Sequence, residues 1–90
     1  MENILTMKNL EACFNIAKEE EMAYVGIKIT VPNSEVCEVI INPTGNFDNK
    51  LEYYKRAYNE DLTLKTFNKI KIVGFTWGNQ YAEIEQDLIW

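Results

Sequence analysis

The sequence contains no histidine, the side chain most often used as a general base and one of the commonest metal ligands. Catalytic triads that depend on histidine are therefore excluded for this chain. The two cysteines, Cys13 and Cys37, belong to no Cys-x-x-Cys pair, so they cannot build a structural zinc site by themselves. The sequence predicts neither a bound metal nor a cofactor.

Phosphate-binding loops and membrane segments are also missing. Neither Gly-x-Gly-x-x-Gly nor Gly-x-x-x-x-Gly-Lys-Ser/Thr occurs. No apolar run reaches the roughly 18 residues of a membrane-spanning helix, and the N-terminus lacks the basic start of a signal peptide. We expect a cytoplasmic protein without membrane contact, with both cysteines reduced and buried. A disulfide between Cys13 and Cys37 stays open on sequence grounds.

What is present is ordinary globular composition with an uneven distribution of charge. The chain has 90 residues, 47% hydrophobic and 26% charged, which predicts one domain over residues 1–90. A net charge of −5 argues against general affinity for nucleic acid or anionic lipid. The acids dominate residues 1–49 and 72–90, whereas residues 50–71 hold six basic side chains against three acidic ones.

Hydrophobic periodicity predicts six elements in the order α-β-β-α-β-α. The first helix is capped by Thr6, and its apolar stripe comprises Leu10, Cys13, Phe14 and Ala17. The predicted helices cover residues 7–20, 48–59 and 81–88, and the predicted strands cover residues 24–31, 35–41 and 69–77. Residues 63–68 are expected to be a polar loop.

This order indicates an α+β fold with a three-stranded, mainly antiparallel sheet. If the third strand returns beside the first, the strand order is 2-1-3, and the helices pack over one face or an end. The second strand, Glu35–Ile41, would then lie at an edge where sheet extension can form a dimer. Monomer and homodimer both remain open.

The segment from Lys50 to Tyr58 mixes basic and aromatic side chains. Such a mixture can contact phosphates and stack on bases, which makes a nucleic-acid-binding module the alternative function. The competing interpretation is an amphipathic helix with its aromatic side chains packed inward, and the acidic flanks favour it. The candidate nucleic-acid contacts are Lys50, Lys55, Arg56, Lys69 and Lys71.

A third hypothesis is a small carboxylate-dependent enzyme. The candidate acids form three clusters, at residues 19–21, 60–61 and 83–87, each beside an apolar stripe as on a solvated helix face. Cys37 lacks any histidine that would lower the pKa of its thiol. We therefore expect no catalytic residue.

Large aromatic residues at the ends of elements are typical anchors for protein partners. Trp77 directly precedes Gly78, and Trp90 is the last residue of the sequence. Three consecutive glutamates at the end of the first helix lie where the helix dipole disfavours acids. The candidate partner contacts are Trp77, Trp90, Tyr53, Glu19, Glu20 and Glu21.

The strings LEYYKRAYNEDL (residues 51–62) and IKIVGFTWG (residues 70–78) resemble small proteins of uncharacterised function encoded by phages and prophages of low-GC Gram-positive bacteria. The resemblance covers about the C-terminal half and brings no catalytic or binding motif. It implies a viral accessory protein that acts in the host cytoplasm by binding a host or phage protein. Together with the residue analysis, it makes a non-enzymatic protein that binds a protein partner, and modulates a host factor or defence system, the leading hypothesis.

Overall fold

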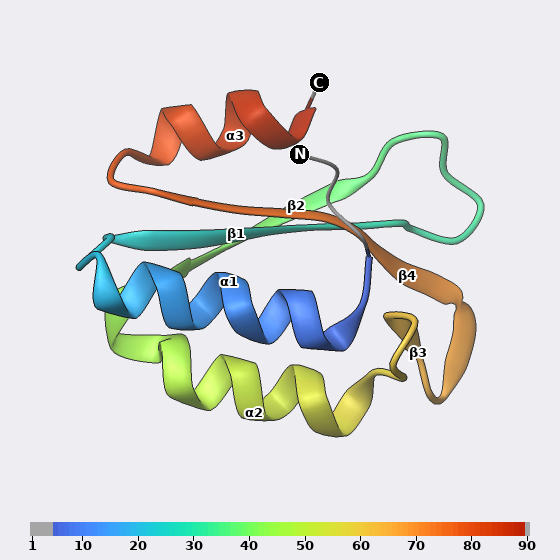
Figure 1. Cartoon of the computed structure of the whole chain (residues 1–90). Helices are drawn as coiled ribbons and strands as arrows, with labels where there is room; N and C mark the ends of the chain where they lie inside the picture. Colours follow the sequence, from blue (N-terminus) through green and yellow to red (C-terminus); the bar gives the residue numbers. More distant parts are fainter. Residues whose placement is uncertain (1–4, 90) are drawn as a thin grey trace.

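The computed structural model describes residues 5–89 and forms two layers of helices around one sheet (Figure 1). The elements in chain order are α1 (Met7–Glu19), β1 (Tyr24–Ile29), β2 (Glu38–Pro43), the 3-10 helix η1 (Thr44–Asn46), α2 (Phe47–Ala57), β3 (Thr63–Leu64), β4 (Phe67–Gly78) and α3 (Tyr81–Ile89). The α+β class is confirmed.

The sheet is antiparallel and has four strands in the order β2-β1-β4-β3. The expected order 2-1-3 corresponds to β2-β1-β4 and is confirmed, but the expected number of three strands is wrong. The additional strand, β3, lies in the segment that was expected to be a loop. Because β3 has only two residues, it is too short to show the alternation of apolar and polar side chains that marks a strand.

The helices divide between the two faces of the sheet instead of sharing one. Helices α1 and α2 cover one face, and α3 covers the other (Figure 1). A β-carbon at Gly26 on β1 would overlap the Ile84 side chain on α3. Gly74 and Gly78 on β4 also lie within reach of α3. The three glycines have no side chains on this face, so the short helix α3 packs closely on it through Ile84 and Leu88.

The main core lies between the sheet and the pair α1 and α2. The predicted stripe of α1 is buried there together with Val25 and Ile27 of β1. Thr6 caps α1 as predicted, since its hydroxyl oxygen accepts a hydrogen bond of 3.2 Å from the Asn9 backbone N–H. A register shift after Lys28 places a bulge in β4, and as a result Ile72 and Phe75 are both buried although three positions apart.

Candidate interaction surface

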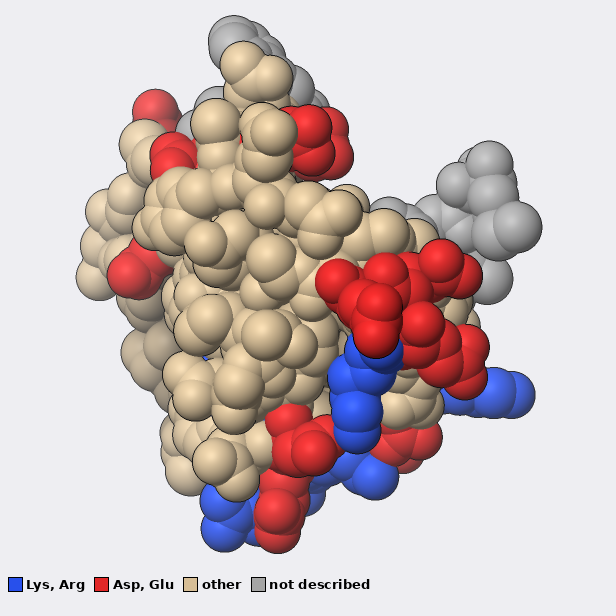
Figure 2. All heavy atoms as spheres, turned by 90° about the vertical axis from the view of Figure 1, so that its left-hand side faces the viewer, with Lys and Arg blue, Asp and Glu red and all other residues tan. Residues whose placement is uncertain are grey.

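Three strand ends meet at one end of the molecule and carry no charged side chain. Tyr24, the first residue of β1, lies between Pro43 at the end of β2 and Gly78 at the end of β4. We call residues 22–24, 43–46 and 77–82 the uncharged end; they contain no Asp, Glu, Lys or Arg. Figure 2 looks at this side and shows a broad area without charge. Charged side chains border it on several sides, and the largest group of carboxylates lies at one margin.

Hydrogen bonds donated by two backbone N–H groups hold the segments of the uncharged end together. The Ala23 carbonyl accepts a bond of 2.9 Å from the Thr44 N–H. The Ala23 N–H donates a bond of 3.0 Å to the Asn79 side-chain oxygen, 56 residues further along the chain. The surface is therefore built from three segments that are distant in sequence and fixed relative to one another.

Aromatic side chains occupy both faces of the sheet at the uncharged end. Trp77 is 38% exposed and pairs with Val25, whose side chain lies in the core beneath α1. Tyr24 packs edge to face against Tyr81, with ring centroids 6.0 Å apart, and Tyr81 is 56% exposed. These rings offer apolar area in a rigid setting, as anchor residues of protein interfaces do.

The three glutamates lie beside the uncharged end in a helix terminus of the Schellman type. The Glu21 N–H bonds to the Lys18 carbonyl and the Met22 N–H bonds to the Ala17 carbonyl. Glu21 has a φ of 56°, the left-handed conformation for which glycine is the usual residue. A glutamate at this position costs backbone free energy that a glycine would not.

The electrostatics at this terminus are also unfavourable. Residues 19–21 are exposed at the C-terminal end of α1, where the helix dipole is negative. The nearest cation in sequence, Lys18, points away and forms an ion pair of 2.7 Å with Asp48 on α2. Within residues 5–89, no ion pair involves the three glutamates. Their charge is therefore available to a partner.

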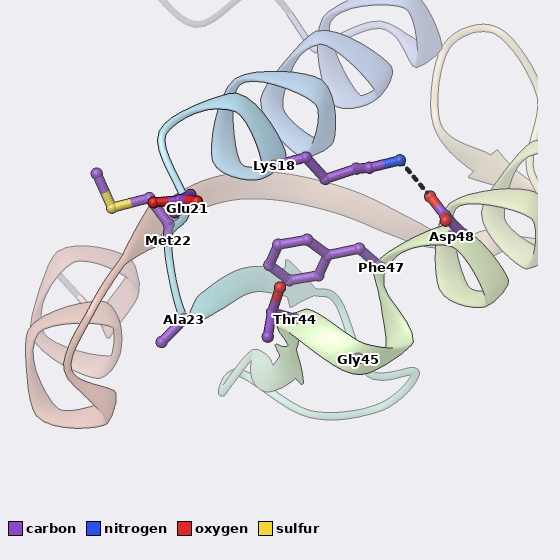
Figure 3. Close-up of a pocket in the computed structure, with 8 residues that line it drawn as sticks. All are labelled: Lys18, Glu21, Met22, Ala23, Thr44, Gly45, Phe47 and Asp48. Atoms are coloured by element: carbon purple, nitrogen blue, oxygen red, sulfur yellow. Dashed lines mark hydrogen bonds and ion pairs between the residues drawn. The ribbon is translucent and has the colours of Figure 1, made fainter.

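An open hollow of about 500 Å³ lies between the end of α1 and the start of α2 (Figure 3). Phe47 is buried at its base and packs edge to face against Phe14, with the ring centroids 5.6 Å apart. The Lys18–Asp48 pair borders one side and Met22 the other, as Figure 3 shows. The hollow thus joins Glu21 to the uncharged end. It is lined by Lys18, Glu21, Met22, Ala23, Thr44, Gly45, Phe47 and Asp48.

The other expected partner contacts do not join this surface. Tyr53 is exposed on α2. The centroid of its ring lies 5.4 Å from the ring centroid of Tyr54 and 5.3 Å from the Lys50 Nζ. Trp90 lies outside the described residues. Of the expected partner contacts, the structure brings Trp77 to the same end as the three glutamates.

The expected nucleic-acid contacts are divided between the two faces of the sheet. Lys55 forms an ion pair of 2.7 Å with Glu11, which raises the pKa of Lys55 and neutralises part of the basic segment. Lys50 and Arg56 also lie on α2. Lys69 and Lys71 alternate on β4 with Ile70, which packs against the main core, so they lie on the opposite face. The structure does not bring the five residues together.

Hydrogen bonding or burial accounts for the shifted pKa values of Asp61 and Cys13. Asp61 accepts hydrogen bonds from the Thr63 N–H and hydroxyl, and these bonds lower the pKa of Asp61. Both cysteines are free thiols. Cys13 is buried as expected, and burial raises its pKa from 9.0 to about 12. The expectation of burial is wrong for Cys37, which is half-buried and directly precedes β2 because this strand begins at Glu38 and not at Glu35. In the described part of the chain, no three Cys, Asp or Glu side chains are grouped closely enough to hold a metal ion.

Sequence reasoning missed Tyr24, Tyr81 and the segment 43–46 as parts of this surface. The absence of charge in segments 22–24, 43–46 and 77–82 was visible, but their proximity depends on the strand register. The left-handed conformation of Glu21 could not be predicted from the sequence either, because such a position is normally marked by glycine.

No helix within residues 5–89 is long and apolar enough to cross a membrane. Comparisons of the chain with models of protein families, with curated proteins and with solved structures found no match.

Proposed function

We propose that the protein acts without catalysis, by binding a protein partner on the uncharged end and the adjoining glutamates 19–21. The observation that carries this proposal is the position of those glutamates. They lie at the negative end of a helix without an ion pair among residues 5–89, and one of them occupies a backbone conformation suited to glycine. Backbone strain of this kind is enriched at functional sites. Leu62 also has a positive φ but is buried in the core, whereas at Glu21 the strain coincides with an exposed charge.

The chemistry of the surface defines the partner. Exposed Trp and Tyr side chains contribute large apolar area at a small cost in conformational entropy, which makes them the usual energetic centres of interfaces. The carboxylates beside them attract a basic rim around that centre and speed association. The partner is therefore a protein with an apolar patch bordered by Lys or Arg.

The setting that fits this chemistry is a phage or mobile-element accessory protein in the cytoplasm of a bacterial host. The resemblance of residues 51–62 and 70–78 to phage proteins motivates this part of the proposal, which includes modulation of a host factor or defence system. Acidic groups next to an apolar surface can compete with a nucleic acid for a basic site on such a partner.

The experiment is capture of partners from a Gram-positive bacterial lysate by the wild-type chain and by Trp77→Ala. Phe67→Ala is the matched control, because Phe67 is 44% exposed and lies at the opposite end of β4. We expect a partner that the wild type and Phe67→Ala retain and that Trp77→Ala loses. Equal retention by all three, or no specific partner, would contradict the proposal.

The nucleic-acid alternative receives less support, because its five basic residues lie on opposite faces of the sheet and one of them is paired. An anisotropy titration with labelled single-stranded DNA at low salt tests it directly. Phosphate contacts would give an affinity that falls steeply with salt and is lost on charge reversal at Lys55 and Arg56.

A further inference from the structure

The two edges of the sheet differ in their protection against pairing with another chain. At one edge, β3 has only two residues, and its Leu64 bridges to Tyr58 just after α2. At the other edge, β2 presents six residues without an internal proline or a bulge against β1. Natural proteins shorten, charge, bulge or cover an exposed edge. Proline on an edge strand is a further device of this kind. Within the described chain, β2 carries Glu38 at one end and Pro43 at the other, and residues 39–42 between them carry none of these devices.

The hydrogen-bond pattern identifies which groups of β2 face outward. The Thr44 N–H bonds to the Ala23 carbonyl, so this pair is of the hydrogen-bonded kind. Hydrogen-bonded and non-hydrogen-bonded pairs alternate along an antiparallel ladder. In the observed register, Asn42 and Ile40 therefore direct their backbone groups to β1. The N–H and C=O groups of Val39 and Ile41 point away from the sheet, with no partner strand among residues 5–89.

Pro43 fits this alternation. It has no N–H to offer, and it occupies a position whose backbone nitrogen faces outward, so β1 loses no hydrogen bond. The outward N–H donors of β2 are consequently those of Val39 and Ile41. The side chains of residues 39–41 are all half-buried in the isolated chain and apolar. A second strand added here would cover them further.

We infer that this edge is a homodimer interface, in which β2 pairs antiparallel with β2 of a second copy about a two-fold axis at Ile40. This dimer is independent of the proposed function. In this register, Val39 lies opposite Ile41 of the other copy, and each pair exchanges both of its backbone hydrogen bonds. All four outward N–H groups of the two chains then find an acceptor.

The side chains support the same register. Glu38 falls opposite Asn42 of the second copy, so the only charged residue of β2 does not meet itself. A shift toward residue 39 brings the two Glu38 carboxylates closer. A shift toward residue 41 places Val39 opposite Pro43, where one of the two hydrogen bonds cannot form. The axis at Ile40 avoids both defects.

The first test measures the dimer by sedimentation equilibrium over a wide range of protein concentration. We expect a reversible monomer–dimer equilibrium for the wild type. Val39→Pro removes one outward N–H per chain and should raise the dissociation constant at least about tenfold. Val39→Thr keeps the N–H and the β-branched shape, and it should dimerise within about threefold of the wild type. A wild type that stays monomeric throughout, or a Val39→Pro dimer of unchanged affinity, would overturn the inference.

The second test fixes the register and does not depend on the folding of a proline variant. In the chain that carries Cys37→Ser, Ile40→Cys places two thiols across a non-hydrogen-bonded pair, where the α-carbons are about 4.5 Å apart. Mild oxidation should therefore convert Ile40→Cys into a covalent dimer. Glu38→Cys on the same face is the control, because its thiol would not meet its own copy. Cross-linking of both variants to the same extent, or of neither, contradicts the proposed axis.

Discussion

Gly26 lies directly beneath Ile84, so closely that a β-carbon on the glycine would overlap the isoleucine side chain. This contact fixes α3 on the face of the sheet opposite α1 and α2, and it thereby positions Tyr81 against Tyr24. The close approach of the helix to β1 is what gives the uncharged end its rigid aromatic pair.

Gly26→Ala should lower the free energy of unfolding by about 1–3 kcal/mol, because the new methyl group forces Ile84 and α3 outward. Gly45→Ala is the control, since a β-carbon at this position would meet no described atom within 4 Å and its φ is not positive. That variant should be neutral or slightly stabilising. Urea unfolding of both variants measures the difference, and equal stabilities would contradict the packing described for α3.

Tyr54→Phe should leave stability unchanged or raise it by up to about 1 kcal/mol. Within residues 5–89, the Tyr54 hydroxyl is buried near Asn42 without a hydrogen bond of ordinary geometry, so its removal relieves an unsatisfied polar group. Asn42 itself donates a bond of 3.2 Å to the Val25 carbonyl. Thermal and urea unfolding test this prediction. A clear loss of stability in Tyr54→Phe would mean that the hydroxyl has a partner.

Stability should fall at alkaline pH because of Cys13. Burial raises the pKa of its thiol from 9.0 to about 12, so the unfolded chain releases this proton first as pH rises. The stabilisation is complete below about pH 9 and declines by up to about 1.4 kcal/mol per pH unit as pH approaches the folded pKa. Cys13→Ala should show a flatter dependence between about pH 9 and pH 11 in urea unfolding. Parallel curves would refute the assignment.

Thr6→Ala should destabilise the protein by about 1 kcal/mol, because the N-terminal end of α1 loses its hydroxyl cap on the Asn9 N–H. Thr6→Ser retains the hydroxyl and should remain within a few tenths of a kcal/mol of the wild type. Guanidinium unfolding distinguishes the two variants. A Thr6→Ser variant as unstable as Thr6→Ala would show that the cap is not the cause.

The parts of the fold that were predictable are those with repeated side-chain patterns. The apolar stripe of α1 and the alternation that includes Val25 and Ile27 correctly predicted which faces are buried, because the positions that face the core are apolar. The position of α3 was not predictable in this way. It depends on the close approach of α3 to Gly26, Gly74 and Gly78. A glycine in a strand does not indicate which helix will cover it.

The candidate site was predictable only in its separate pieces. Trp77 and residues 19–21 stood out for their residue types and positions. Their common location depends on the strand register that places Tyr24 beside Gly78, and on the tight helix terminus that leads from Glu21 into β1. Long-range pairing of this kind leaves no local pattern in the sequence.

The most direct test of the central claim is the amount of captured partner that Glu21→Gly retains relative to the wild type. Glycine suits the left-handed conformation at this position, so unfolding of the variant should require about 0.5–1 kcal/mol more free energy. Binding should nevertheless weaken, because one carboxylate is lost from the rim of the interface. A variant that is more stable and retains less partner is the result we predict. A variant that retains as much partner as the wild type would contradict the claim that these glutamates are kept for binding.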